Sequence, residues 1–389
     1  MSVRVLTLAA GLSLLGGLPL AAQSLFGSSG LGLPLEAVDA RARGLGNLGI
    51  GLSGGALLPG DPAAAARLRL PSALLVAQPS WSDASDGVET NYFQGTRFPL
   101  MAAAYPVAGG IFSIHFASLM DQDFQGERVS SVMLGGVPTV TTDSFEQDGS
   151  VSSMNVGFAR MLTPQTSVGL TVGRYTGTFE RSLIRTVDPG ATGNPIQDFV
   201  SAGSWTYAGY LVTGGVATRV ADLLNLAASA TWSTQLDAEA SATTQGGDGS
   251  FDVPLQLRAG ASADLAPGLT LSASAVRADW SAVADDLNDG SNARATTALG
   301  VGLELTQARL LGREAPLRLG FRRADLPFSL NSGKASERIF SAGLGLSLNQ
   351  TGEFVLASAD MSLERGRRSA GVFAENFWRA TLSLRLAGL

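Results

Sequence analysis

The sequence predicts an all-β fold, a transmembrane antiparallel β-barrel of about 14 strands. Alternate residues near the end of the chain are apolar and polar, which is the period of an extended strand. Segments of this kind recur along the chain, and a tilted strand needs roughly 9 to 11 residues to cross a bilayer. Short and long connections alternate between them, as in outer-membrane barrels. The last strand shows the pattern, with Trp378, Ala380, Leu382, Leu384 and Leu386 on one face and Arg379, Thr381, Ser383 and Arg385 on the other.

Residues 1–22 are predicted to be a signal peptide that is removed on export. Arg4 supplies one positive charge, the stretch 5–20 is almost wholly apolar, and small residues precede Gln23. This order of charge, apolar stretch and small residues is typical of secretory signals. Cleavage is predicted after Ala22. An N-terminal membrane anchor is the alternative, although the segment is short for a spanning helix.

Composition excludes several kinds of site. The chain has no Cys, a single His, 15% charged residues and a net charge of −6. An exported chain without Cys has neither disulfides nor thiolate metal sites, so we expect no metal and no cofactor. No basic run suggests nucleic acid. After Leu20 no apolar run reaches the roughly 18 residues of a spanning helix. A barrel fits this composition best, and a soluble all-β protein fits it less well.

Residues 23–73 are predicted to form an N-terminal plug or hatch inside the barrel. This stretch is rich in Gly, Ala and Leu and lacks alternation. Within it, 61–67 predicts a short helix, because Asp61 is a favoured N-cap and Pro62 suits the first helical position.

Residues 74–389 are predicted to form the barrel, and its segments repeat the period of two. The eighth segment is among the clearest, with Phe251, Val253, Leu255 and Leu257 on one face. The predicted strands are 74–84, 97–106, 109–120, 151–162, 166–180, 203–219, 224–240, 251–265, 268–280, 295–308, 315–323, 337–348, 353–365 and 375–388. Long polar loops are predicted at 121–150, 181–202, 241–250, 281–294, 324–336 and 366–374. The short turns and the long loops predict a periplasmic and an extracellular end, respectively.

Short motifs at the start of the mature chain resemble the FadL superfamily of outer-membrane proteins, and particularly its PorV/PorQ-like branch. These are Ala40-Arg41-Ala42-Arg43-Gly44-Leu45-Gly46, Gly49-Ile50-Gly51 and Asp61-Pro62-Ala63. In that family an A-R-x-x-G-x-G stretch precedes an Asn-Pro-Ala element, and here Asp61 replaces the usual Asn. The resemblance implies a 14-stranded barrel with an internal plug. It implies passage of hydrophobic molecules in the FadL branch, or a part in protein secretion in the PorV branch.

Charged side chains on the polar faces of the strands are predicted to form a lumen network. In a barrel they would point inward, where opposite charges can pair with one another or hold a plug. The predicted lumen residues are Arg258, Glu304, Arg318, Arg322, Asp360, Glu364, Arg379, Arg385 and His115. The predicted plug residues are Arg41, Arg43, Gly44, Gly46, Gly49, Asp61 and Pro62.

Other motifs have weaker interpretations. The G-x-G-x-x-G stretch that begins at Gly44 lacks a preceding strand, so tight turns are favoured over nucleotide binding. His115 with Ser113 could belong to a hydrolase, but no third catalytic group is evident. Residues 285–290 resemble the start of a calcium loop without its closing Glu. Tryptophans and tyrosines near strand ends are predicted to form interfacial girdles, and an aromatic-lined hydrophobic pocket is the alternative for a few of them. They are Trp81, Trp205, Trp232, Trp280, Trp378, Tyr92, Tyr105, Tyr175, Tyr207 and Tyr210.

The sequence therefore favours a non-enzymatic, FadL-like outer-membrane channel for small hydrophobic molecules, with a plug-gated lumen. The alternative is a PorV-like barrel that takes part in secretion or docks proteins and transports nothing. We expect the cell outer membrane of a diderm bacterium as its location. Expected partners are outer-membrane lipid, hydrophobic small molecules, secretion-system proteins and the barrel assembly machinery. Leu389 stands where that machinery usually recognises an aromatic residue.

Overall fold

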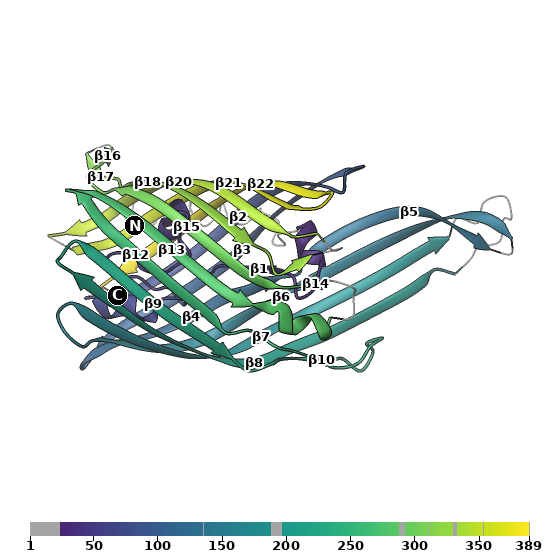
Figure 1. Cartoon of the computed structure of the whole chain (residues 1–389), viewed down its shortest axis with the longest axis horizontal. Coiled ribbons are helices and arrows are strands. Elements are labelled where there is room, and N and C mark those ends of the chain that lie inside the picture. The colour runs from purple at the N-terminus through teal and green to yellow at the C-terminus, as the bar shows by residue number, and fades with distance from the viewer. Residues whose placement is uncertain are drawn as a thin grey trace, which may run out of the picture.

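Fourteen strands close into one antiparallel barrel, as predicted (Figure 1). The structure is a computed structural model that describes residues 24–134, 136–187, 197–287, 292–310, 312–329, 333–352 and 354–388. The predicted signal peptide and Leu389 lie outside these residues. In pairing order, the barrel strands are β2 (Ser72–Ser85), β3 (Thr90–Val107), β4 (Gly110–Asp121), β6 (Val137–Met161), β7 (Thr166–Val187), β8 (Phe199–Val220), β9 (Leu224–Ser233), β12 (Gln256–Ala266), β13 (Leu269–Asp279), β15 (Ala295–Leu305), β18 (Leu317–Asp325), β20 (Ser336–Thr351), β21 (Phe354–Ala370) and β22 (Phe373–Ala387).

The last strand closes the barrel against the first. β22 pairs with β2 over most of its length, and Trp378 lies opposite Trp81. Closure leaves no open edge, so every barrel strand has two neighbours. The last strand therefore pairs along its length with the strand that contains Leu74.

Shorter elements complete the chain. Strand β5 (Phe124–Leu134) pairs with β6, and β10 (Leu236–Ala240) pairs with both β8 and β11 (Gly249–Phe251). Two small ladders join β14 (Asn292–Ala293) to β19 (Phe328–Ser329) and β16 (Arg309–Leu310) to β17 (Arg313–Glu314). The 3-10 helix η4 (Trp280–Asp285) follows β13. No helix among the described residues is long and apolar enough to cross a membrane.

Each predicted strand segment overlaps one barrel strand, but the prediction of a loop over 121–150 was wrong. Residues 124–134 form β5, and β6 already begins at Val137. Likewise β7 continues to Val187 and β8 begins at Phe199. These extensions rise beyond the rest of the barrel, at the right of Figure 1. With water on both faces, a strand there does not need the apolar alternation that revealed the others.

The two faces of the barrel differ as the alternation predicts. On β22, Trp378 and Leu382 are 43% and 42% exposed, whereas Arg379 and Thr381 are 3% and 0% exposed. The outer face is therefore apolar, as contact with lipid tails requires, and the polar residues face inward.

Residues 24–71 run along the inner side of the wall before β2 begins. They form η1 (Leu25–Ser28), β1 (Leu33–Pro34), α2 (Ala40–Gly44) and η2 (Pro62–Arg67). β1 pairs with the end of β4, at Asp121 and Met120. We call residues 24–71 the inner segment.

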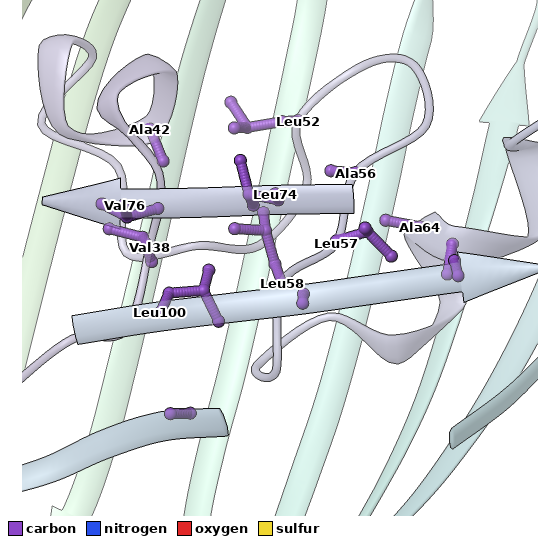
Figure 2. Packing of buried hydrophobic residues seen from close by; sticks show 14 of the residues in the cluster. Val38, Ala42, Leu52, Ala56, Leu57, Leu58, Ala64, Leu74, Val76 and Leu100 are labelled. Atoms are coloured by element: carbon purple, nitrogen blue, oxygen red, sulfur yellow. The ribbon is translucent and has the colours of Figure 1, made fainter. Parts of the chain in front are cut away.

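Apolar side chains pack residues 45–58 of the inner segment against the wall of the barrel. Leu45, Leu52, Leu57 and Leu58 are at most 3% exposed and belong to one cluster with Leu74, Val76 and Leu100 of β2 and β3 (Figure 2). Burying one leucine side chain contributes roughly 1.5–3 kcal/mol. Packing of this kind holds the inner segment against β2 and β3.

Glycines allow close approach between the inner segment and the wall. A Cβ at Gly300 of β15 would collide with the carbonyl oxygen of Gly46, and one at Gly260 of β12 would collide with Ile50. Gly46 itself has a φ of 59°, which favours glycine. The glycine stretch of the sequence thus forms tight turns against a glycine-lined wall.

The helix over 61–67 occurs at the predicted place, as the 3-10 helix Pro62–Arg67. Asp61 occupies the N-cap position and Pro62 begins the helix, as predicted, but the Asp61 side chain makes no cap hydrogen bond. Its Oδ2 instead accepts the backbone N–H of Gly51 at 3.1 Å. A real side-chain cap occurs at Asp39, which accepts the N–H of Ala42 at the start of α2.

Substituting Gly300 with Val should displace the inner segment. The new side chain would meet the backbone of Gly46, and overpacking of this kind costs about 1–3 kcal/mol. The free energy of unfolding in guanidinium should fall by that amount. Gly214→Val on β8 is the control, because a Cβ there meets nothing within 4 Å. Equal effects of the two substitutions would contradict the close approach.

Candidate functional site

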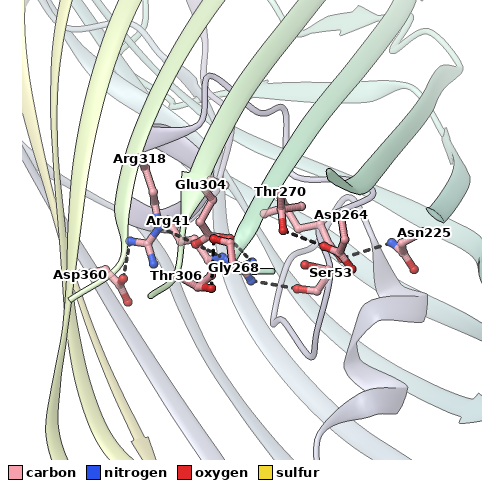
Figure 3. A network of polar contacts seen from close by, with 12 residues as sticks. Arg41, Ser53, Asn225, Asp264, Gly268, Thr270, Glu304, Thr306, Arg318 and Asp360 are labelled. Atoms are coloured by element: carbon pink, nitrogen blue, oxygen red, sulfur yellow. Dashed lines mark hydrogen bonds and ion pairs between the residues drawn. The ribbon is translucent and has the colours of Figure 1, made fainter. Parts of the chain in front are cut away.

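An ion network ties the inner segment to the wall (Figure 3). Arg41 of α2 makes two hydrogen bonds to Glu304 of β15, at 2.6 and 3.0 Å. Glu304 also accepts from Arg318 of β18 at 2.8 Å, and Arg318 reaches Asp360 of β21 at 2.6 Å. Arg41 donates further to the carbonyl oxygen of Ser53 at 2.9 Å. We call Arg41, Glu304, Arg318 and Asp360 the latch.

All the residues predicted for the lumen network face inward. Arg379 and Glu364 form a buried pair at 2.7 Å, and Arg322 approaches Glu337 at 4.0 Å. Arg385 donates to the carbonyl oxygen of Gly55 in the inner segment at 3.2 Å. The structure therefore brings most predicted charges into pairs that face the inner segment.

Arg258 and His115 are exceptions to this close pairing. Arg258 bonds to Thr231 at 3.2 Å and to Gln256 at 2.7 Å, but lies 3.9 Å from Glu36. His115 is 6% exposed, and neither ring nitrogen has a hydrogen-bond partner among the described residues. Its partner across the ladder is Asn155, so no base–nucleophile pair is formed there.

The predicted plug residues lie together along the inner segment. Arg43 is buried and donates to the carbonyl oxygen of Glu36 at 2.5 Å. Gly44 lies against Gly343 of β20, and Gly49 has a φ of 76°. Pro62 packs against Gly169 and Gly215, which lie on β7 and β8.

A second ion network was missed by the sequence analysis. Arg368 pairs with Glu375 at 2.6 Å and with Glu337 at 2.9 Å. Glu375 also accepts the hydroxyl of Ser24, at the start of the inner segment, at 2.7 Å. The predicted strand ended at residue 365, so Arg368 was assigned to a loop. Continued alternation through Arg368 would have placed it on the polar face.

Two small cavities remain between the inner segment and the wall. One, of about 70 Å³, is lined by Val38, Leu48, Tyr175 and Leu211. The other, of about 80 Å³, has a mixed lining, with Met120, Val276 and Trp280 on one hand and Arg322, Asp325 and Glu337 on the other. Leu35, Glu36 and Arg258 line both cavities and so stand between them.

A larger hollow opens at the end of the barrel that carries the long connections, among residues of β7, β8 and β11. Its volume is about 380 Å³, and we call it the vestibule. The stacked rings of Phe179 and Trp205, 5.7 Å apart, line it together with Leu31, Tyr207 and Phe251. Its polar lining includes Gln122, Gln147, Arg181, Asp248 and Asp286. This is the size and the mixed lining of a small-molecule site.

One apolar cluster reaches all three hollows. Tyr207 and Leu31 line the vestibule, Tyr175 lines the first cavity, and Trp280 lines the second. The girdle prediction was wrong for these three aromatic residues, since they are only 2–4% exposed, and they instead line hollows as the alternative prediction had it. In the alternation of β7 and β8, Tyr175 and Tyr207 fall on the inward face. The alternation could therefore have placed both side chains in the lumen.

No group of three or more His, Cys, Asp or Glu residues among the described ones could hold a metal. The calcium-like stretch 285–290 is described only as far as residue 287.

Several solved structures share this fold. The toluene transporter TbuX of Ralstonia pickettii has a TM-score of 0.59 and 15% identity, over 91% of this chain and 99% of that one. The toluene transporter TodX of Pseudomonas putida has a TM-score of 0.59 and 14% identity, over 91% and 99%. A FadL homologue of Pseudomonas aeruginosa has a TM-score of 0.58 and 12% identity, over 96% and 100%.

The fold is that of the FadL-type channels. The predicted FadL resemblance thus holds for the architecture, and the PorV/PorQ-like branch stays a prediction. No protein-family model matches the sequence, and no curated protein matches it either. The likeness lies in the three-dimensional arrangement, at identities of 12–15%.

A carboxyl group just beyond β4 has a shifted pKa. Burial, and then the negative charge of Asp121, raise the pKa of Asp123 to about 7. Asp121 is itself paired with Arg97 at 2.8 Å. The Asp123 side chain accepts the N–H of Gly149, and its carbonyl oxygen accepts the N–H of Ser24. This residue therefore couples the start of the inner segment to β6.

Substitution Glu304→Gln should weaken the latch strongly. Glu304 is the only carboxylate among the described residues that bonds to both Arg41 and Arg318, and its side chain is 3% exposed. Breaking a buried pair leaves uncompensated charge, which costs on the order of 3 kcal/mol. The free energy of unfolding should fall accordingly.

The control for the latch is Arg185→Met on β7. Arg185 pairs with Asp143 at 2.5 Å, but their side chains are 41% and 18% exposed. Exposed pairs contribute about 0–1 kcal/mol, so a small effect is expected. A loss as large as that of Glu304→Gln would mean that burial does not set the strength of the latch.

The raised pKa of Asp123 predicts a pH dependence of stability. The folded state favours the protonated carboxyl, so this stabilisation is full below the usual pKa of 3.8 and is lost as the pH rises through about 7. The melting temperature, followed by electrophoretic mobility, should therefore fall between pH 4 and 7. In Asp123→Asn that part of the fall should disappear. Asp222→Asn, at a side chain that is 95% exposed, is the control and should keep it.

Proposed function

We propose that this protein is an outer-membrane channel that lets small hydrophobic molecules cross. The observation that carries the proposal is the apolar aromatic cluster that links the vestibule to the two inner cavities. The similar folds of TodX and TbuX, which are named as toluene transporters, support it. Residues 1–22 would direct export, and the apolar outer belt would hold the barrel in the bilayer.

A packed lumen suits apolar solutes better than an open pore. A water-filled channel gives an apolar molecule no free-energy gain, whereas an apolar pocket gains roughly 25 cal/mol per Å² of surface removed from water. Phe179, Trp205 and Tyr207 would take the molecule from outside. The cluster around Tyr175 and Trp280 would then pass it toward the cavities beside Leu35.

The inner segment would act as the gate. In its present position it fills the lumen from Ser24 to Arg67, so passage requires part of it to shift. Leu35 and Glu36 separate the two cavities. The Leu35 N–H donates to the carbonyl oxygen of Leu119 at 2.8 Å, the Glu36 carbonyl oxygen accepts from Arg43 at 2.5 Å, and the Glu36 carboxylate lies 3.9 Å from Arg258. The latch would hold α2 in place while the stretch around Leu35 and Glu36 moves. The barrel would then keep its wall intact during passage.

One observation favours the docking alternative. Val129 and Met133 of β5 and Val137 at the start of β6 are 71%, 65% and 56% exposed. Exposed apolar side chains on a sheet can mark a protein contact. A PorV-like barrel that docks a secretion-system protein would use this surface. Such a barrel would need no lumen pathway.

Uptake of radiolabelled toluene into proteoliposomes tests the channel. Removing the stacked ring with Trp205→Ala should lower the uptake rate severalfold, because the vestibule loses apolar contact area. Trp232→Ala is the matched control, since Trp232 is an outward tryptophan that is 57% exposed. Uptake no faster than in protein-free liposomes would contradict the channel proposal.

Deletion of residues 24–71, checked for folding, should raise the rate of toluene uptake if the inner segment is the gate.

A further inference from the structure

Three arginines stand side by side on the outer face of the barrel. Arg323 of β18 lies directly opposite Arg338 of β20, which lies directly opposite Arg367 of β21. All three side chains are exposed, and their strands meet the long connections at this end, opposite the end where the barrel begins and finishes. We call these three residues the arginine row.

The arginine row lacks compensating charge in the protein. Like charges directly across a ladder are destabilising. Glu337 and Glu364 lie on the inward face of the same strands and are used by Arg368 and Arg379. The outward Asp325 accepts the backbone N–H of Thr297 at 3.1 Å. Among the described residues no carboxylate forms an ion pair with the row.

Aromatic side chains lie directly below the row on the same face. The next outward residues are Phe321, Phe340, Arg365 and Trp378, which are neighbours across the four strands. The rings of Phe321 and Phe340 are 4.9 Å apart, and Arg365 lies 5.0 Å from the Trp378 ring. This arrangement is that of an interfacial girdle.

Aliphatic side chains follow below the aromatic ones. Leu319, Ala342, Leu363 and Ala380 are paired in the same order, and Leu319 and Leu363 are 63% and 45% exposed. The face therefore passes from cationic to aromatic to aliphatic toward the middle of the barrel. A molecule that covers this face must place anionic groups on the arginine row and hydrocarbon chains on the aromatic and aliphatic side chains.

We propose that this face binds a phosphate-bearing lipid of the surrounding outer leaflet. Guanidinium groups match phosphate oxygens bidentately, and three adjacent ones fit a lipid that carries more than one phosphate. Its acyl chains lie along Phe340, Trp378 and Leu363. The bound lipid relieves the repulsion within the row. This inference rests on the proposed membrane location but not on transport.

Native mass spectrometry of the full chain tests the proposal. The protein is reconstituted in phosphatidylcholine nanodiscs that contain a small fraction of bis-phosphorylated lipid A, and is then released in mild detergent. The wild type should retain lipid A. The triple variant Arg323→Gln/Arg338→Gln/Arg367→Gln should bind it about 10-fold more weakly or worse, since charge-assisted bonds are lost. Equal retention by the two would overturn the proposal.

A matched control removes the same charge elsewhere. Arg160→Gln/Arg174→Gln/Arg309→Gln changes three exposed arginines outside this face and should retain lipid A as the wild type does. If this control also loses lipid A, the loss in the first triple variant comes from the change in net charge alone, and the proposal is overturned. Where the first triple variant does not fold, Arg338→Gln alone removes the centre of the row and should still weaken retention.

Two further arms identify the chemistry. Lipid A without phosphates should not be retained, and its retention would overturn the role of the row. Inorganic phosphate at matched phosphate concentration should displace little lipid. Full displacement would mean that the row binds any phosphate and that the acyl chains contribute nothing, which would overturn the lipid site. Toluene uptake by the triple variant should equal that of the wild type. The proposal can therefore fail while the channel stands, and the channel can fail while the lipid site stands.

Discussion

The need to pair every backbone N–H and C=O group within the bilayer determines this architecture. Hydrocarbon offers no hydrogen-bond partners, so an open sheet edge there would cost several kcal/mol for each unpaired group. The ladder between β2 and β22 removes the last edges. Because the wall is closed, polar side chains must turn inward, and the lumen acquires a dense set of charges. Those charges in turn require partners, and the inner segment supplies some of them, chiefly Arg41 to Glu304.

The inner segment therefore acts both as packing and as counter-charge. Its glycines let backbone approach backbone at Gly300 and Gly260, which brings Arg41 within reach of Glu304 on β15. A bulkier wall would hold the segment away and leave Glu304 with a single arginine partner. The same lumen also holds aromatic residues, from Tyr207 to Trp280, that need no charge partners. Charged and apolar regions are thus separated within one lumen.

Alternation predicts strands only where one face meets lipid. It located all fourteen barrel segments, yet it missed β5, because both of its faces meet water. It placed Glu304 and Arg318 on the inward face, but the partner Arg41 lies 263 residues from Glu304 along the chain. No local pattern can reveal such a contact. Arg368 was missed for a simpler reason, since the predicted strand stopped three residues too early.

The energetics favour a local shift of the inner segment over its expulsion. Leu45, Leu52, Leu57 and Leu58 are almost fully buried, and exposing all four would cost on the order of 6–12 kcal/mol. Breaking the latch would add its own penalty, because Glu304 and Arg318 are both buried. Around Leu35, by contrast, small cavities already exist on both sides, and the contact from the Glu36 carboxylate to Arg258 is long at 3.9 Å. A shift here breaks two hydrogen bonds, from Leu35 to Leu119 and from Arg43 to Glu36, but exposes no large cluster of leucines. Motion confined to this stretch would join the two cavities while α2 and the leucines stay in place.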